Sequence, residues 1–311
     1  MDFNFDILLQ QIFNGLVLGS VYALVALGYT MVYGILQLIN FAHGDVLMVG
    51  AMVAVTVVGM LVKTGLPLPI VLIVAILAAI PVCILLSLFI ERVAYRPLRN
   101  APRLAPLITA IGVSIVIQTL AMMIWKPNPI VFPDLLPTTP IMLGEVVMAP
   151  KQLLILFVSA VMMVGLIILV NKTRLGRAMR ATAENPRIAG LMGVNANQVI
   201  AATFAIGAAL AAIAGVLVAM NYNIVQFTMG FMPGLKAFTA AVLGGIGNLA
   251  GAMVGGLLLG VIESLAAGYI GDITGGFLGS NYQDIFAFVV LIIVLVFKPS
   301  GIMGERVADR A

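Results

Sequence analysis

Long apolar runs, separated by short polar or charged stretches, dominate the chain. A helix that crosses a membrane needs about 20 predominantly apolar residues. Eight runs reach or approach this length, and we expect each to be a full crossing: residues 10–34, 46–62, 68–90, 104–125, 152–171, 197–221, 250–269 and 283–297. The pattern predicts an all-α polytopic membrane protein, folded as one transmembrane domain over residues 1–311.

A further apolar run, residues 233–244 (PGLKAFTAAVLG), is too short for a full crossing. Twelve helical residues extend about 18 Å, whereas the hydrocarbon core is roughly 30 Å thick. We therefore expect a broken or re-entrant helix here, which is tolerated where it is buried in protein or faces a watery cavity. Charged side chains in such surroundings should face the protein interior or an aqueous path, and Lys236 and Glu263 are the two candidates. For Lys236, a position at the membrane interface is an equal alternative.

Composition excludes several classes of protein. Hydrophobic residues make up 62% of the chain and charged residues only 9%, which is outside the range of soluble domains. A single cysteine, Cys83, excludes internal disulfides, and a single histidine leaves little for catalysis or metal binding. The chain has no GxxxxGK[ST] phosphate-binding loop, so we expect it to hydrolyse no ATP and to hold no cofactor of its own.

Basic residues gather in three polar segments. Four arginines lie in 92–103, five basic residues lie in 172–187, and Lys298, Arg306 and Arg310 follow the last run. Lysine and arginine in short loops mark the cytoplasmic side of a membrane protein. If 233–244 counts as a crossing, all three segments lie on that side. The N-terminus and the proline-rich loop 126–150 are then expected outside.

The segment 171–197 carries its own helix signals. Residues 174–184 read as one short helix, and Asn185 can cap a second one, with Pro186 at its first position, where a missing N–H costs little. This second helix has an apolar side, and Gly193 is placed to end it. A polar segment with this much internal structure favours a docking surface. A solvated positive loop without a partner is the alternative.

Three smaller patterns concern helix contacts and symmetry. Gly15 and Gly19 give the first crossing a small-xxx-small face for close helix packing. Asn195 with Gln198 resembles a capping box that opens the crossing after the polar segment. The tetrapeptide GAMV occurs at 50–53 and at 251–254, each time after a polar or glycine-rich break and before an outward crossing. The repetition predicts a weak two-fold internal repeat, an arrangement common in transporters.

Several longer segments together give the chain a specific resemblance to a known family. It is similar to the membrane-spanning permeases of bacterial branched-chain amino acid ABC importers, of the LivH type. The resemblance covers nearly the whole chain, with 127–150 matching least. The segments that carry it are NGLVLGSVYALVALGYTMVYGILQLINFAHGD (14–45), ERVAYRPLR (91–99), GRAMRATAENPRIAGLMGVN (176–195) and KAFTAAVLGGIG (236–247).

The resemblance implies a multi-pass subunit of the bacterial inner membrane. Such a permease forms the pathway for leucine, isoleucine or valine by alternating access. It pairs with a second, related permease. Two cytoplasmic ATPase subunits use ATP to drive it, and a periplasmic binding protein delivers the substrate. By the same resemblance, 171–197 is the segment that couples to the ATPases, and its contact residues are expected to be Arg180, Ala183, Glu184, Arg187 and Gly190.

Residues near the helix breaks are the candidates for lining the pathway, namely Asn40, His43 and Thr239. Other functions stay open at this point. The same transporter class could carry urea, short amides or other small solutes. An ion-coupled secondary transporter usually has several intramembrane acids, and Glu263 is the only good candidate here. A membrane-embedded enzyme would need a cluster of acids, bases or metal ligands, which one histidine argues against.

Overall fold

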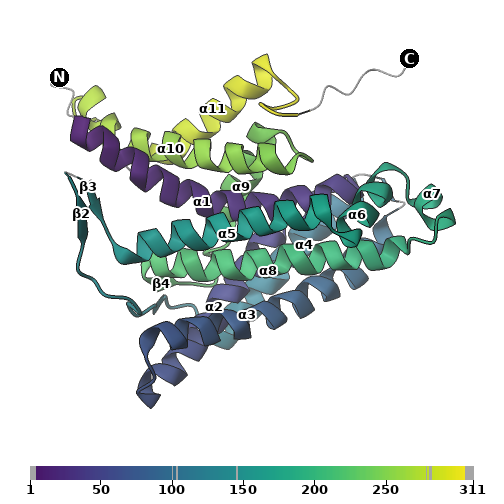
Figure 1. The fold of residues 1–311 in the computed structure, drawn as a ribbon, viewed down its shortest axis with the longest axis horizontal. Coiled ribbons are helices and arrows are strands. Elements are labelled where there is room, and N and C mark those ends of the chain that lie inside the picture. Colours follow the sequence, from purple (N-terminus) through teal and green to yellow (C-terminus); the bar gives the residue numbers. More distant parts are fainter. Residues whose placement is uncertain are drawn as a thin grey trace.

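The computed structural model describes residues 5–99, 101–102, 104–144, 146–277, 279 and 282–304. Long helices dominate these residues and lie roughly side by side (Figure 1). The elements in chain order are α1 (Phe5–Leu36), α2 (His43–Leu61), α3 (Leu68–Ile90), α4 (Leu104–Trp125), β1 (Ile130–Val131), β2 (Ile141–Leu143), β3 (Val146–Met148), α5 (Pro150–Lys172), α6 (Arg174–Glu184), α7 (Pro186–Leu191), α8 (Ala196–Tyr222), β4 (Ile224–Val225), α9 (Phe231–Gly244), α10 (Leu249–Ile273) and α11 (Gln283–Phe297).

Within the described residues, seven helices are long and apolar enough to cross a membrane: α1, α2, α3, α4, α5, α8 and α10. The chain is thus an all-α polytopic membrane protein, as its pattern predicts. The eighth expected crossing, at 283–297, is present as a shorter apolar helix, α11. Helix α11 has 15 residues, so it extends only about 22 Å, less than a hydrocarbon core of roughly 30 Å. The short helix expected at 233–244 is present as α9, with 14 residues.

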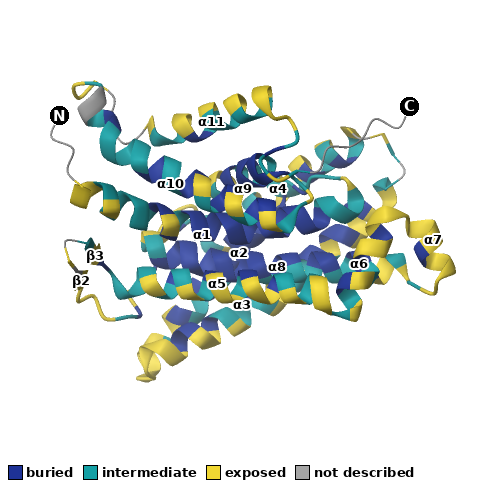
Figure 2. Cartoon of the chain, turned by 45° about the horizontal axis from the view of Figure 1, so that its top comes forward, coloured by how far each residue is buried: buried dark blue, intermediate teal, exposed yellow. Residues whose placement is uncertain are grey.

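Helices α1, α2 and α8 form the centre of the bundle. Figure 2 shows their ribbons mostly buried, while α3, α5 and α11 carry exposed residues along their length. The most apolar window of α1 is 89% buried, against 17% for α4. Because α4 is apolar on all sides, its exposed side chains, such as Ile108 and Met123, are suited to lipid or to another membrane subunit.

Small residues hold α1 against α10. A Cβ atom built on Gly15 would lie 2.5 Å from the Cα of Val261, and one built on Gly256 would lie 2.5 Å from the backbone of Ala23. Gly19 packs in the same way on backbone atoms of Gly256. Helices in lipid gain stability from close backbone packing of this kind. The small-xxx-small face predicted for the first crossing is therefore confirmed, and α10 is its partner.

Gly260→Ala should lower the free energy of unfolding by about 1–3 kcal/mol, the usual cost of overpacking a tight contact. Any side chain at Gly260 would collide with backbone atoms of Gly19 and Gly15. The matched control is Gly112→Ala on α4, where a Cβ meets no atom within 4 Å. This control should be neutral or stabilising, because alanine favours helix more than glycine does. Thermal unfolding in detergent measures both variants, and equal melting temperatures would contradict this account of the α1–α10 contact.

Two segments expected to be irregular are partly helical. Residues 91–103 read as a basic loop, but the helical path continues from α3 through a π-helix, Glu91–Tyr95, and a 3-10 turn, Arg96–Leu98. An ion pair between Arg99 and Glu91 and the burial of Tyr95 stabilise this extension. The break after the first crossing is also shorter than expected, because α2 begins at His43 and not at residue 46.

The loop 126–150 is ordered by short strands. β1 pairs with β4 in antiparallel register, Ile130 opposite Val225, and β2 pairs with β3 to form a hairpin. The hairpin lies at the same end of the molecule as the start of α1, while α6 and α7 lie at the opposite end (Figure 1). The expectation that 126–150 and 171–197 lie on opposite sides agrees with this arrangement.

Helix α9 begins inside the bundle. A Cβ atom on Gly44, at the start of α2, would lie 2.5 Å from the carbonyl oxygen of Gly230, the residue that precedes α9. From there α9 runs beside α10 and α1, with most of its small residues buried. The breaks before α2 and before α9 thus meet at one place in the core. The two-fold repeat suggested by GAMV stays a prediction.

Candidate functional site

The segment between α5 and α8 folds as two short helices with well-formed ends. The side chain of Asn185 accepts hydrogen bonds from the backbone N–H groups of Arg187 at 3.0 Å and Ile188 at 3.2 Å, which caps α7. Asn195 caps α8 in the same way. Gly193 has a φ of +84°, a left-handed conformation that glycine adopts without strain. The helix boundaries and the N-caps of Asn185 and Asn195 predicted for this segment are confirmed, and of the expected capping box the bond from the Gln198 N–H to Asn195 is present.

Helix α6 is fastened to the end of α5. Gly176 packs so closely on the last turn of α5 that a Cβ there would overlap the carbonyl of Val170. Met179 and Thr182 are buried, and Arg180 donates a hydrogen bond to the carbonyl oxygen of Val170. A displacement of α6 must therefore move α5. This arrangement can transmit a movement of α6 directly to α5, a membrane-spanning helix.

All five residues expected to contact an ATPase are exposed: Arg180, Ala183, Glu184, Arg187 and Gly190. Glu184 ends α6 and Arg187 lies in α7, so both flank the junction between the two helices. Among the described residues, no salt bridge involves Glu184. Arg180 differs from the others, because its guanidinium already binds the end of α5. Whether these residues contact an ATPase stays a prediction.

The apolar side of α7 faces outward, which the sequence alone did not reveal. Ile188 is 58% exposed, Leu191 87% and Met192 81%, whereas Ala189 is buried. In Figure 2, α6 and α7 form an exposed tip at one end of the molecule. Exposed apolar side chains beside charged ones, at the end of a rigid helix pair, are typical of a surface that is covered by a partner.

A buried ion network joins four helices, α1, α9, α10 and α11. The ammonium of Lys236 in α9 lies 2.6 Å from Oε1 of Glu263 in α10 and 2.7 Å from Oδ1 of Asp284 in α11. The hydroxyl of Tyr22 in α1 lies 3.3 Å from both Lys236 Nζ and Glu263 Oε1. Lys236 is 6% exposed and Glu263 0%. Of the two positions open to Lys236, the structure therefore shows the protein interior.

A cavity of about 630 Å³ borders this network. We call it the α4–α9 cavity, since it lies between α4, the end of α8 and the start of α9. Its volume falls within the range of small-molecule binding sites, about 300–1,000 Å³. It is lined by Tyr22, Gln118, Val218, Tyr222, Ile224, Gln226, Thr228, Met229, Phe231, Met232, Pro233 and Lys236.

A second cavity, of about 80 Å³, lies on the other side of Phe231. We call it the α2–α9 cavity, and its walls include Tyr29, Phe41, Asp45 and Ser114. Phe231 lines both cavities. Gln118 of the first cavity donates a hydrogen bond of 2.9 Å to Oδ1 of Asp45 in the second. The two cavities are thus adjacent and are separated by Phe231 and this hydrogen bond.

The three residues expected to line a pathway are all buried, and none of them lines these two cavities. Asn40 accepts a hydrogen bond of 3.0 Å from the hydroxyl of Tyr95. His43 packs edge-on against Tyr29, with ring centroids 4.9 Å apart. The hydroxyl of Thr239 donates to a backbone carbonyl of the preceding turn. Tyr29, which His43 contacts, is a wall residue of the α2–α9 cavity. The role of the three residues in a pathway stays a prediction.

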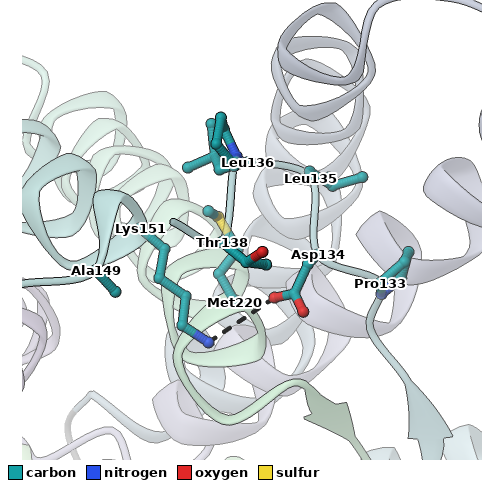
Figure 3. A pocket seen from close by; sticks show the side chains of 9 residues that line it. Pro133, Asp134, Leu135, Leu136, Thr138, Ala149, Lys151 and Met220 are labelled. Carbon is teal, nitrogen blue, oxygen red and sulfur yellow. Dashed lines mark ion pairs between the residues drawn. The ribbon is translucent and has the colours of Figure 1, made fainter. Parts of the chain in front are cut away.

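At the end of the molecule that carries the hairpin, a third cavity of about 230 Å³ lies under residues 133–138. Figure 3 shows Lys151 and Asp134 pointing toward one another across it, 3.9 Å apart. Asn223 bridges the two, accepting from Lys151 Nζ at 2.5 Å and donating to Asp134 at 2.6 Å. These contacts fasten the loop to the start of α5 and the end of α8.

Among the described residues, no group of three or more His, Cys, Asp or Glu side chains could hold a metal ion.

Comparison with known proteins gives matches over the whole chain. The family model of the branched-chain amino acid transport system permease component matches residues 11–295. The branched-chain amino acid transport permease BraD of Pseudomonas aeruginosa is 48% identical over 97% of both chains. The high-affinity branched-chain amino acid permeases LivH of Salmonella typhimurium and Escherichia coli are 44% and 43% identical over 100% of both chains. No solved structure matches the chain significantly. Since the family model and these relatives each span almost the full length, the chain belongs to the family of permease components of branched-chain amino acid transport systems.

Proposed function

We propose that this chain is the permease subunit of an ATP-binding cassette importer that carries leucine, isoleucine and valine across the bacterial inner membrane. The observation that carries the proposal is the full-length identity of 43–48% to permeases whose names describe high-affinity branched-chain amino acid transport. Seven membrane-spanning helices and a cavity of the size of a small-molecule site support it.

The importer would be completed by other subunits. A second, related permease pairs with this chain, two cytoplasmic ATPases bind at 171–197, and a periplasmic protein delivers the substrate at the opposite side. The rigid attachment of α6 to α5 supports the coupling role, because it lets ATP-driven movement reach a membrane-spanning helix. The exposed apolar tip of α7 supports a protein partner there. In this mechanism the ATPases close, α6 and α7 move with them, and the pathway alternates between its two openings.

The uptake of radiolabelled leucine tests this function. The chain is produced with its neighbouring ATPase, permease and binding-protein subunits in cells that lack their own branched-chain amino acid importers. We expect ATP-dependent uptake of leucine, isoleucine and valine, which excess unlabelled leucine abolishes. Uptake of urea or a short amide in place of these amino acids would overturn the substrate assignment. Uptake driven by an ion gradient without the ATPases would overturn the transporter class.

The purified chain alone should hydrolyse no ATP. The sequence has no phosphate-binding loop, and this motif is what cradles the phosphates and the magnesium ion in such ATPases. Phosphate release is measured with the isolated chain in detergent and again after the ATPase subunits are added. Hydrolysis should appear only in the second mixture. Turnover by the chain alone, in a preparation free of other subunits by mass spectrometry, would contradict the assignment of ATP hydrolysis to partners.

A further inference from the structure

We propose that the α4–α9 cavity holds the amino acid during transport, with the aliphatic side chain against Val218, Met229 and Met232, and that Phe231 separates this space from the α2–α9 cavity. This inference rests on the proposed function and adds the place and the residues of substrate contact. The α4–α9 cavity is the larger of the two spaces that adjoin the meeting point of the helix breaks.

The cavity has room for the substrate, and the space beyond it does not. Its volume of about 630 Å³ lies inside the range of small-molecule sites, whereas the 80 Å³ of the α2–α9 cavity lies below that range. An amino acid that enters the first cavity therefore stops at Phe231 in this conformation. To go further it must displace this ring and break the hydrogen bond between Gln118 and Asp45.

The cavity walls provide both an apolar surface and polar groups, and a branched-chain amino acid needs both. Val218, Met229 and Met232 offer an apolar surface, and methionine side chains adapt to ligands of slightly different shape. This adaptability suits three substrates that differ by single methyl or methylene groups. Around the same cavity, Tyr22, Tyr222 and Lys236 present polar groups toward which the charged amino and carboxylate groups can turn.

The ion network places charges of both signs at the polar end of the α4–α9 cavity. The ammonium of Lys236 donates hydrogen bonds to Glu263 and Tyr22, and it also lies 2.7 Å from a carboxylate oxygen of Asp284. Because two carboxylates already neutralise this ammonium, it holds a substrate carboxylate only weakly. Groups of both signs lie together here, which matches a zwitterion without strong net attraction. The cavity therefore binds the amino acid transiently, as a pathway requires, while a separate binding protein supplies the affinity.

One side of the cavity is open in the single chain. Phe231 is 59% exposed, Tyr222 54% and Met232 40%, although they lie beside buried charges. In the proposed importer a second permease subunit closes this side. The pathway then runs between the two permeases, and α9 with its buried lysine forms one wall of it.

Thiol labelling tests the proposal, because the chain has a single cysteine to remove. Cys83 is buried and donates to the carbonyl of Val46, so Cys83→Ser keeps a donor there and gives a cysteine-free background. Met229→Cys is introduced into this background and assembled into the complete transporter. We expect a bulky methanethiosulfonate reagent to lower leucine uptake at least tenfold, and saturating leucine to slow the labelling at least threefold.

Two further variants make the result decisive. Met123→Cys is the matched control, since Met123 lies on α4 outside the cavity and is 73% exposed. Its labelling should change uptake less than twofold and should not respond to leucine. Val218→Cys provides a second wall position on α8, for the case that Met229→Cys does not assemble. If both wall cysteines are labelled without loss of uptake or protection by leucine, the cavity does not carry the substrate. If the cysteine-free transporter itself takes up no leucine while the unmodified one takes up another solute, the proposed function fails instead.

Discussion

Replacing Lys236 by methionine should lower the free energy of unfolding by about 3–5 kcal/mol, the usual cost of removing one member of a buried ion pair. Glu263, whose side chain is fully buried, would lose its counter-ion, and Asp284, whose side chain is 31% exposed, would lose the same partner. Methionine fills a similar volume, so the effect comes from charge and not from a cavity. The melting temperature of the detergent-solubilised protein measures the loss.

The double variant Lys236→Met/Glu263→Gln is the control for this explanation. It removes the buried carboxylate together with its counter-ion, and glutamine can still bind Tyr22 and Gln283 near their present positions. Stability should recover by at least half of the loss, because no fully buried charge remains unpaired. Asp284→Asn alone should cost less than Lys236→Met, since Glu263 still pairs with the lysine. A double variant no more stable than Lys236→Met would show that the charge is not the cause.

Features set by short sequence spacing could be predicted well. The cap of Asn185, the position of Pro186 and the left-handed Gly193 depend on residues within a single turn, and all are found where the sequence puts them. The glycines Gly15 and Gly19 also predicted a close helix contact, because small residues four apart lie on one helix face. Their partner helix α10 could not be predicted, since no local pattern specifies which of the other helices is adjacent.

The ion network could be predicted only in part. Intramembrane charges at Lys236 and Glu263 were visible in the sequence, and their high cost in lipid implied that they face protein or water. Their pairing was not visible, because Tyr22, Lys236, Glu263 and Asp284 lie on four different helices. Only the packing of α1, α9, α10 and α11 brings them together. The cavity beside them was missed for the same reason, and the sequence pointed instead to Asn40, His43 and Thr239, none of which lines it.

Helix lengths show the limit of apolarity as a signal. Residues 283–297 are strongly apolar, but the helix that they form, α11, has only 15 residues. Conversely, residues 91–98 are rich in charge and still extend the path of α3, because the carboxylate of Glu91 is paired with Arg99. Hydropathy reports how well a segment tolerates lipid. It does not report where its backbone hydrogen bonds end, which sets the length of a helix.

Glu184→Lys should abolish substrate uptake while the protein is inserted at normal levels. Glu184 is exposed at the last position of α6, beside the capped junction with α7, and is the only acid in a segment with five basic residues. If this junction enters a groove on an ATPase, a lysine at position 184 leaves a cationic group of the ATPase without the carboxylate that it pairs with. Losing one member of a buried charged pair costs on the order of 2–5 kcal/mol, and 1.4 kcal/mol already weakens binding about tenfold. Uptake and co-purification with the ATPase are measured side by side in the same membranes.

Glu184→Gln is the graded control, because it removes the charge and keeps the size. Its uptake should fall between the unmodified transporter and Glu184→Lys. If Glu184 only offsets nearby arginines in water, both variants should change the relevant free energies by about 0–1 kcal/mol, and normal uptake with normal assembly would rule out a docking role. Normal assembly with lost uptake would have another meaning. Since α6 is fastened to α5 through Gly176 and Arg180, that outcome would place Glu184 in the transmission of movement and not in binding.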